Sequence, residues 1–162
     1  ESLINRPQFS FIRMDREPSE DLREMSVFDF EKGYRSFFNG DEVAVISHGY
    51  MLGNLYKILK RDAKLSKRVR LFDLFFSKPL PKNFKSELLP FKSVVVVDEQ
   101  IEQSSLGRYL LRLIVDDRPL ANVATLHLRE EFMFANSGRK GLIEEAGLGE
   151  GVLSKLMGEI GT

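Results

Sequence analysis

A run of four valines, Val94–Val97, lies between Ser93 and Asp98 and constrains the fold more than any other feature of the sequence. A strand that is apolar at every successive position is buried on both faces, which is typical of parallel sheets covered by helices on both sides. The residues that follow, 98–105, are mostly polar, and Leu106 then begins an apolar pattern with helical spacing. The sequence therefore predicts a central strand that ends in a polar loop, at the edge of the sheet where α/β proteins place their sites.

Strands and helices alternate along the whole chain. Short apolar runs bounded by turn residues indicate strands, and apolar residues repeated at intervals of three and four indicate helices. The predicted strands are residues 9–12, 27–30, 43–46, 69–74, 93–97 and 121–126. The predicted helices are residues 51–59, 82–89, 106–114 and most of 137–160. This alternation predicts a three-layer α/β/α sandwich with a mainly parallel sheet of about five strands.

Composition excludes several classes of partner and chemistry. The chain has 162 residues, with 24 basic and 24 acidic side chains, so no net charge favours nucleic acid or an anionic membrane. It has no cysteine, which excludes disulfides and thiolate chemistry, and its two histidines, His48 and His127, lack metal-ligand spacing. No apolar run approaches the length of a membrane span. We expect a soluble, cytoplasmic protein.

Two of the loops predicted at the carboxyl edge of the sheet carry polar groups. Ser47-His48-Gly49-Tyr50 follows a strand and opens a helix, where backbone amides are able to bind an anion, but the pattern is more typical of a tight turn. Asp98, Glu99 and Glu102 form an acidic cluster that suits acid–base chemistry if burial raises one pKa. Because no basic partner or nucleophile is placed beside them by sequence, we favour a solvated or capping loop.

Three other side chains have functional and structural interpretations. Arg13 and Arg16 follow the predicted strand 9–12, and planar guanidinium groups suit phosphate or carboxylate binding, although arginines in a charged loop are usually solvated. His127 follows a predicted strand, with no serine or carboxylate at the spacing of a catalytic triad. From the residues alone, solvated arginines and a histidine of unassigned role are the simpler interpretation.

Five segments resemble, in the right order, the C-terminal domain shared by transketolases, deoxyxylulose-phosphate synthases and the beta subunits of 2-oxoacid dehydrogenases. They are residues 11–16 (the end of the preceding pyrimidine-binding domain), 40–51 (the first strand-turn-helix), 73–80 (a strand ending in Lys-Pro-Leu), 94–107 (the valine run) and 141–153 (the final helix element). The family often has a glycine pair where Ser104 and Ser105 stand, and aspartates near Pro81 and Gly149. These departures leave the branch of the family open.

The resemblance implies a domain division and an activity. Residues 1–26 would be the end of the pyrimidine-binding domain and a linker, and residues 27–162 a transketolase C-terminal-like domain. The first residues, which lack an initiator methionine, are expected to lie inside a longer protein. The complete enzyme would use thiamine diphosphate and Mg²⁺ to transfer two-carbon ketol units between phosphorylated sugars. The glutamate that activates the cofactor in the family would lie before residue 1, so this chain is expected to bind neither cofactor nor metal and to be inactive alone.

The same resemblance implies one site residue and several partners. Related enzymes place an arginine after the strand that resembles 9–12, which assigns Arg16 to a substrate phosphate; no catalytic residue is assigned. The expected partners are upstream cofactor-binding domains or a second subunit, a homodimer mate and a phosphorylated sugar. The alternatives are a deoxyxylulose-phosphate synthase, a 2-oxoacid dehydrogenase beta subunit, or a stand-alone anion-binding or interaction module that uses the helix starts after Ser47 and Gln103.

Overall fold

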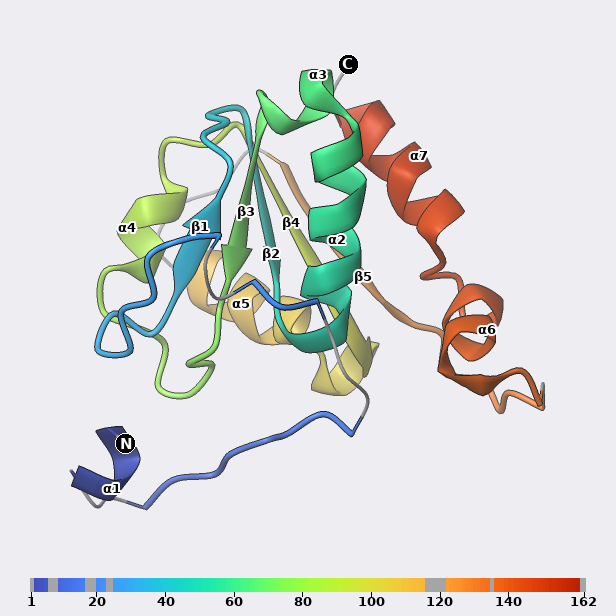
Figure 1. Cartoon of the computed structure of the whole chain (residues 1–162), viewed down its shortest axis with the longest axis horizontal. Coiled ribbons are helices and arrows are strands. Elements are labelled where there is room, and N and C mark those ends of the chain that lie inside the picture. The colour runs from blue at the N-terminus through green and yellow to red at the C-terminus, as the bar shows by residue number, and fades with distance from the viewer. Residues whose placement is uncertain are drawn as a thin grey trace.

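The computed structural model describes residues 2–5, 9–16, 20–22, 25–115, 122–134 and 136–160. Its centre is a five-stranded sheet with strand order β1-β3-β2-β4-β5 (Figure 1). The strands are β1 (Arg35–Phe37), β2 (Val43–Ser47), β3 (Val69–Asp73), β4 (Ser93–Ile101) and β5 (Asn122–Leu128). The last four are parallel to one another, and β1 pairs antiparallel with β3 at one edge. The predicted mainly parallel sheet is confirmed.

Helices cover both faces of this sheet, which confirms the three-layer sandwich. The helices are α1 (Ser2–Asn5), α2 (Gly49–Arg61), α3 (Ala63–Ser66), α4 (Phe84–Leu88), α5 (Leu106–Val115), α6 (Gly138–Glu145) and α7 (Glu150–Ile160), with the 3₁₀ turn η1 (Glu102–Ser104) before α5. Residues of α2, α3, α6 and α7 share one apolar core with the sheet, and residues of α4 and α5 share a second core on the opposite face. Figure 1 shows α4 and α2 on opposite sides of the strands.

The four valines of β4 lie between these two cores, as predicted. Each is at most 1% exposed. Val95 and Val97 belong to the core under α2, whereas Val94 and Val96 belong to the core under α5, because successive strand residues point to opposite faces. The helix on that second face approaches closely: a Cβ atom at Gly107 would lie 2.7 Å from the Thr125 side chain.

The predicted end of the central strand at Val97 is wrong. β4 continues to Ile101, because an irregularity between Val97 and Ile101 allows the strand to pair again with β5, where Ile101 lies opposite Leu128. Asp98 and Glu99 are therefore strand residues, and the polar turn begins only at η1. Backbone pairing holds this stretch in the sheet although its side chains are polar.

Two predicted strands near the N-terminus are also wrong. Residues 9–12 and 27–30 form no strand, and Phe9 and Phe11 are fully exposed. Phe28 and Phe30 pack instead against a loop: the Phe28 ring centre lies 4.9 Å from that of Phe75. The edge strand of the sheet comes later, at Arg35–Phe37.

The remaining elements match the sequence with small shifts. The predicted strand 121–126 is β5, which ends at Leu128, and Ala121 lies outside the described residues. The predicted helix 82–89 is the shorter α4, and the helical tail is divided into α6 and α7. None of the described helices has the length and apolar character that crossing a bilayer requires. The domain boundary at residues 26 and 27 stays a prediction.

Candidate functional site

The carboxyl edge of the sheet collects the buried polar side chains of the described residues. These are Ser47, Asp73, Asp98 and Ser105, each at most 7% exposed. Ser47 and Asp73 end the neighbouring parallel strands β2 and β3, and Asp98 follows the last valine of β4. The carboxyl ends of parallel strands lie at one edge of the sheet, so polar residues at these ends lie close together. The site was predicted at this edge, and the buried polar side chains are found there.

Asp98 connects His48 to the start of α5. Its Oδ2 accepts a hydrogen bond of 2.6 Å from the Leu106 amide, and its Oδ1 lies 3.2 Å from His48 Nε2. Burial alone would raise the pKa of Asp98, but the hydrogen bonds from His48 and Leu106, with the charges of His48 and Arg13, outweigh it and lower this pKa. Asp98 is thus an ionised helix cap that also orients an imidazole.

A second buried carboxylate lies near the same histidine. Asp73 Oδ2 accepts a hydrogen bond of 3.0 Å from Arg35 Nε. Burial raises the pKa of Asp73, although the hydrogen bond and charge of Arg35, and then the charge of His48, act in the opposite direction. His48 itself is about one third exposed, so its imidazole is held by Asp98 on one side and is accessible to solvent on the other.

The neighbouring hydroxyl is not arranged as a nucleophile. Ser47 Oγ donates a hydrogen bond of 2.8 Å to the carbonyl oxygen of Val97. The next residues turn sharply into α2: His48 is extended and caps the helix without a side-chain hydrogen bond, while Gly49 has a left-handed φ of 58°. This backbone is what the tight-turn interpretation of 47–50 requires. The chemistry that this edge supports is acid–base or anion binding, without a Ser-His-Asp triad.

A second polar cluster lies beside the first. Arg139, in the first turn of α6, donates hydrogen bonds to both carboxylate oxygens of Asp15 and to both of Glu99. Its guanidinium lies 4.2 Å from the centre of the Tyr50 ring. Hydrogen bonds from Arg139 to Asp15 and then Glu99 raise the pKa of this arginine and keep it charged. The cluster joins the N-terminal segment (residues 9–16), β4, α2 and α6 at the same edge.

The sequence-predicted site residues are divided among these clusters. Asp98 caps α5, as the capping interpretation requires, whereas Glu99 pairs with Arg139 and Glu102 pairs with Arg108 at 3.2 Å on the surface. Arg13 lies near enough to Asp98 for its charge to act on that carboxylate. Arg16 is exposed, and its phosphate-binding role stays a prediction. His127 lies within β5, with Nδ1 3.2 Å from the Leu128 carbonyl oxygen.

Sequence reasoning missed Arg35 and Arg139. Arg139 is 124 residues from Asp15 and 40 residues from Glu99, and no local spacing links three residues so far apart. The only signal was the turn pattern Asn136-Ser137-Gly138, which marks a helix start close to the predicted helical tail.

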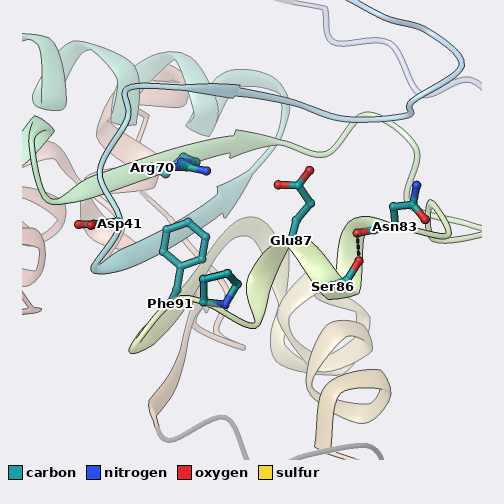
Figure 2. Close-up of a pocket in the computed structure, with 7 residues that line it drawn as sticks. Asp41, Arg70, Asn83, Ser86, Glu87 and Phe91 are labelled. Atoms are coloured by element: carbon teal, nitrogen blue, oxygen red, sulfur yellow. Dashed lines mark hydrogen bonds between the residues drawn. The ribbon is translucent and has the colours of Figure 1, made fainter.

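A cavity of about 420 Å³ lies away from both polar clusters (Figure 2). It is next to α4, near the opposite ends of the strands, because Asp41 precedes β2 and Arg70 belongs to the start of β3. Its lining also includes Asn83, Ser86, Glu87, Pro90 and Phe91. The Arg70 guanidinium lies 5.3 Å from the Phe91 ring, and its Nε is buried without a hydrogen-bond partner. With acids and one arginine in an open hollow, this cavity has less organised chemistry than the carboxyl edge.

Comparison with known proteins identifies the fold. No family model matches the sequence, and no curated protein matches it. Among solved structures the chain is similar to one described as "Split gene transketolase, inactive beta4 tetramer", with 16% sequence identity and a TM-score of 0.72. The chain has a transketolase-like fold.

The similarity to this transketolase chain extends over most of the present chain but over less than half of the other. The match includes 90% of this chain and 46% of the other, so the chain spans less than half the length of that transketolase chain. The predicted resemblance to the transketolase C-terminal domain is therefore confirmed for the fold, and the five-stranded, mainly parallel sheet agrees with it. In this transketolase-like fold, the two polar clusters lie where the parallel strands end.

Substitution of Asp98 provides a test of the cap at this edge. We expect Asp98→Asn to lower the free energy of unfolding at pH 7 by about 1–2 kcal/mol, since the amide keeps an acceptor for Leu106 but loses the charge. The pKa of Asp98 is lowered in the folded protein, so its contribution is complete above the ordinary value of 3.8 and is lost as the pH falls through the folded value. Denaturant unfolding of the wild type and of Asp98→Asn between pH 7 and pH 3 measures this contribution to the free energy of unfolding.

The expected pH profile is a difference between wild type and variant that decreases below about pH 4. Asp73, whose raised pKa acts in the opposite sense, is present in both proteins and cancels. Glu102→Gln, at an exposed carboxylate of the same turn, is the control and should change the free energy of unfolding little. A difference for Asp98→Asn that is constant with pH would contradict the ionised cap.

Proposed function

We propose that this chain is the C-terminal domain of a thiamine diphosphate-dependent, transketolase-type enzyme that transfers two-carbon ketol units between phosphorylated sugars. The observation that carries the proposal is the transketolase-like fold, with its TM-score of 0.72 over 90% of the chain. The resemblance of five segments in the same order supports it. The domain would complete the enzyme and support its assembly, and it would be inactive alone.

The cofactor is assigned to other domains or to a second subunit. Thiamine diphosphate, when bound, supplies the electron sink for two-carbon transfer, and its diphosphate needs Mg²⁺. Within the described residues no group of three or more His, Asp or Glu side chains is placed to hold a metal ion. The acids of the carboxyl edge are occupied by protein partners: Asp98 by His48 and the Leu106 amide, and Glu99 by Arg139. These residues do not fit the cofactor.

The residues of this chain would contribute substrate binding instead. Arg13 and Arg16 belong to the segment that Asp15 connects to the carboxyl edge, and this edge also presents the oriented His48 imidazole. We assign Arg16 to a phosphate of the substrate, because its guanidinium is exposed and suits bidentate binding of phosphate oxygens. The negative charge of a sugar phosphate would be attracted to a segment with two arginines.

The proposed partners follow from the 46% of the solved transketolase chain that this chain covers. The solved relative comes from a split gene and forms a tetramer of beta chains described as inactive. This favours a partner that supplies the cofactor site, either upstream in the same protein or as a second subunit, together with a homodimer mate. The assay that tests the proposal is transfer from a phosphorylated ketose to an aldose phosphate by the complete enzyme. Turnover with a 2-oxoacid donor only would favour the synthase and dehydrogenase branches.

Titration with the cofactor tests the assignment of roles. We expect the 162-residue chain to fold without cofactor and to give no saturable heat at micromolar concentrations of thiamine diphosphate with Mg²⁺, because the groups that would bind them lie in other domains. Isothermal titration calorimetry measures this, with the complete enzyme as the positive control. Saturable binding to the chain itself would overturn the division of roles.

A further inference from the structure

Arg139 connects the N-terminal segment, residues 9–16, to the rest of the domain through several hydrogen bonds. Its Nη1 and Nη2 donate to the two carboxylate oxygens of Asp15 at 2.6 and 2.8 Å. Its Nε and Nη2 donate to the two oxygens of Glu99 at 2.9 and 2.6 Å. Two carboxylates, one from the segment and one from β4, are therefore bridged by a single guanidinium.

This bridge is stronger than an ordinary surface ion pair. The side chains of Arg139 and Glu99 are only 19% and 18% exposed, so solvent screens them less than the exposed pairs that contribute almost nothing. Both carboxylates are bound by two hydrogen bonds, the geometry that the planar guanidinium favours. Tyr50, whose ring centre lies 4.2 Å from the guanidinium, restricts its position further.

Apolar packing does little to hold the N-terminal segment in place. It has no helix or strand, and Phe9, Phe11 and Met14 are all more than 80% exposed. In Figure 1 it runs as an extended blue trace below the carboxyl ends of the strands. Polar contacts with the edge of the sheet, above all the hydrogen bonds between Asp15 and Arg139, hold it there.

The spacing of these contacts along the segment determines which of its side chains face away from the domain. In an extended chain, residues two apart share one side and successive residues face opposite sides. Asp15 accepts two hydrogen bonds from Arg139, which places its side chain on the inner side of the segment. Arg16 follows Asp15 directly and is exposed. A bridge to Asp15 therefore limits the positions of Arg16 without occupying its guanidinium.

We propose that Arg139 is a positioning residue, which ties Asp15 to the carboxyl edge and so holds Arg16 where it binds a substrate phosphate. This inference rests on the proposed function of Arg16. Glu99 and Tyr50 serve the same purpose, since they fix the guanidinium that holds Asp15.

Backbone dynamics test the anchor without any substrate. In the 162-residue chain, we expect NMR order parameters of the amides of residues 13–16 to fall from about 0.85 to below about 0.6 in Arg139→Ala. Arg139→Lys should give a partial loss, because an ammonium cannot bridge two carboxylates bidentately. Asp15→Ala removes the contact while leaving the Arg139–Glu99 pair, so it shows the same loss even if Arg139→Ala is poorly folded. Lys140→Ala, the next residue of α6 and exposed, is the matched control.

Kinetics of the complete enzyme test the positioning role. We expect Arg139→Ala to raise KM for a phosphorylated acceptor about threefold to tenfold, because a mobile Arg16 is binding-competent for only a fraction of the time. The change should disappear in an Arg16→Ala background and for an unphosphorylated acceptor. Order parameters unchanged by both Arg139→Ala and Asp15→Ala would overturn the anchor. Mobile amides with an unchanged KM, in an enzyme whose Arg16→Ala does raise KM, would overturn the positioning role.

The same measurements separate this inference from the proposed function. If the amides become mobile and neither Arg16→Ala nor Arg139→Ala changes KM for a phosphorylated acceptor, the phosphate-binding role of Arg16 is wrong. The anchoring of the segment by Arg139 would then stand as a structural property, and the positioning role would be withdrawn together with the Arg16 assignment.

Discussion

Val96→Asp is expected to unfold the domain or make it insoluble. Val96 is 1% exposed and lies in the core between the sheet and α5, with Ile46 and Thr125 opposite it on the neighbouring strands. A carboxylate placed there has no charged partner and costs about 3–5 kcal/mol, which is a large part of the 5–15 kcal/mol that stabilises a typical domain. Thermal melting followed by circular dichroism would show the loss.

The matched control is Val152→Asp, the same substitution on the outer side of α7. Val152 is 45% exposed, so its carboxylate would remain in water and the melting temperature should change little. A melting temperature of Val96→Asp within a degree or two of the parent would contradict a sheet covered on both faces. That outcome would remove the basis of the transketolase-like fold as well.

The central layer of the fold was predictable because its signal is local. Four successive apolar residues distinguish a strand buried on both faces from one exposed on one face, and the helical spacing after Leu106 distinguishes the next element. These patterns correctly predicted β2, β3, β4 and β5 and the layers around them. The carboxyl edge followed from the parallel order, since strands joined by crossover helices end on the same side.

The edge of the sheet was not predictable from composition. Residues 9–12 and 27–30 have the apolar, aromatic character of strands, yet neither pairs with the sheet. Strand formation at an edge depends on a partner, and β3 takes Arg35–Phe37 as its neighbour. A basic residue, a serine and one buried phenylalanine give such a short strand no distinct pattern.

One of the two polar clusters of the candidate site was predictable, and the reason is again the separation of its residues along the sequence. Asp98 and His48 each follow an apolar strand run, so the sequence placed both at the carboxyl edge, although it did not predict that they contact each other. The Asp15–Arg139–Glu99 cluster depends on side chains from three distant parts of the chain. Arginine is common in charged loops, and only the folded arrangement distinguishes Arg139 from the solvated arginines.

Arg16→Ala is expected to have the largest effect on function in the complete enzyme. If Arg16 binds a substrate phosphate, its removal weakens the binding of phosphorylated substrates by about 1.5–3 kcal/mol, the contribution of a charge-assisted hydrogen bond. This corresponds to a loss of about 10-fold to 150-fold in kcat/KM. Affinity for thiamine diphosphate should not change, because the cofactor is assigned to other domains. Steady-state kinetics with a phosphorylated and an unphosphorylated acceptor measure the difference.

Arg13→Ala is the comparison that distinguishes a phosphate contact from a general effect of charge. Both substitutions remove one positive charge from the same segment, and both arginines are exposed, but the charge of Arg13 acts on Asp98. Arg13→Ala should therefore affect phosphorylated substrates less than Arg16→Ala does. Equal losses for phosphorylated and unphosphorylated acceptors in Arg16→Ala would mean that Arg16 acts through the structure of the linker. The assignment of a phosphate to this residue would then have to be withdrawn, while the fold and the Asp98 cap would be unaffected.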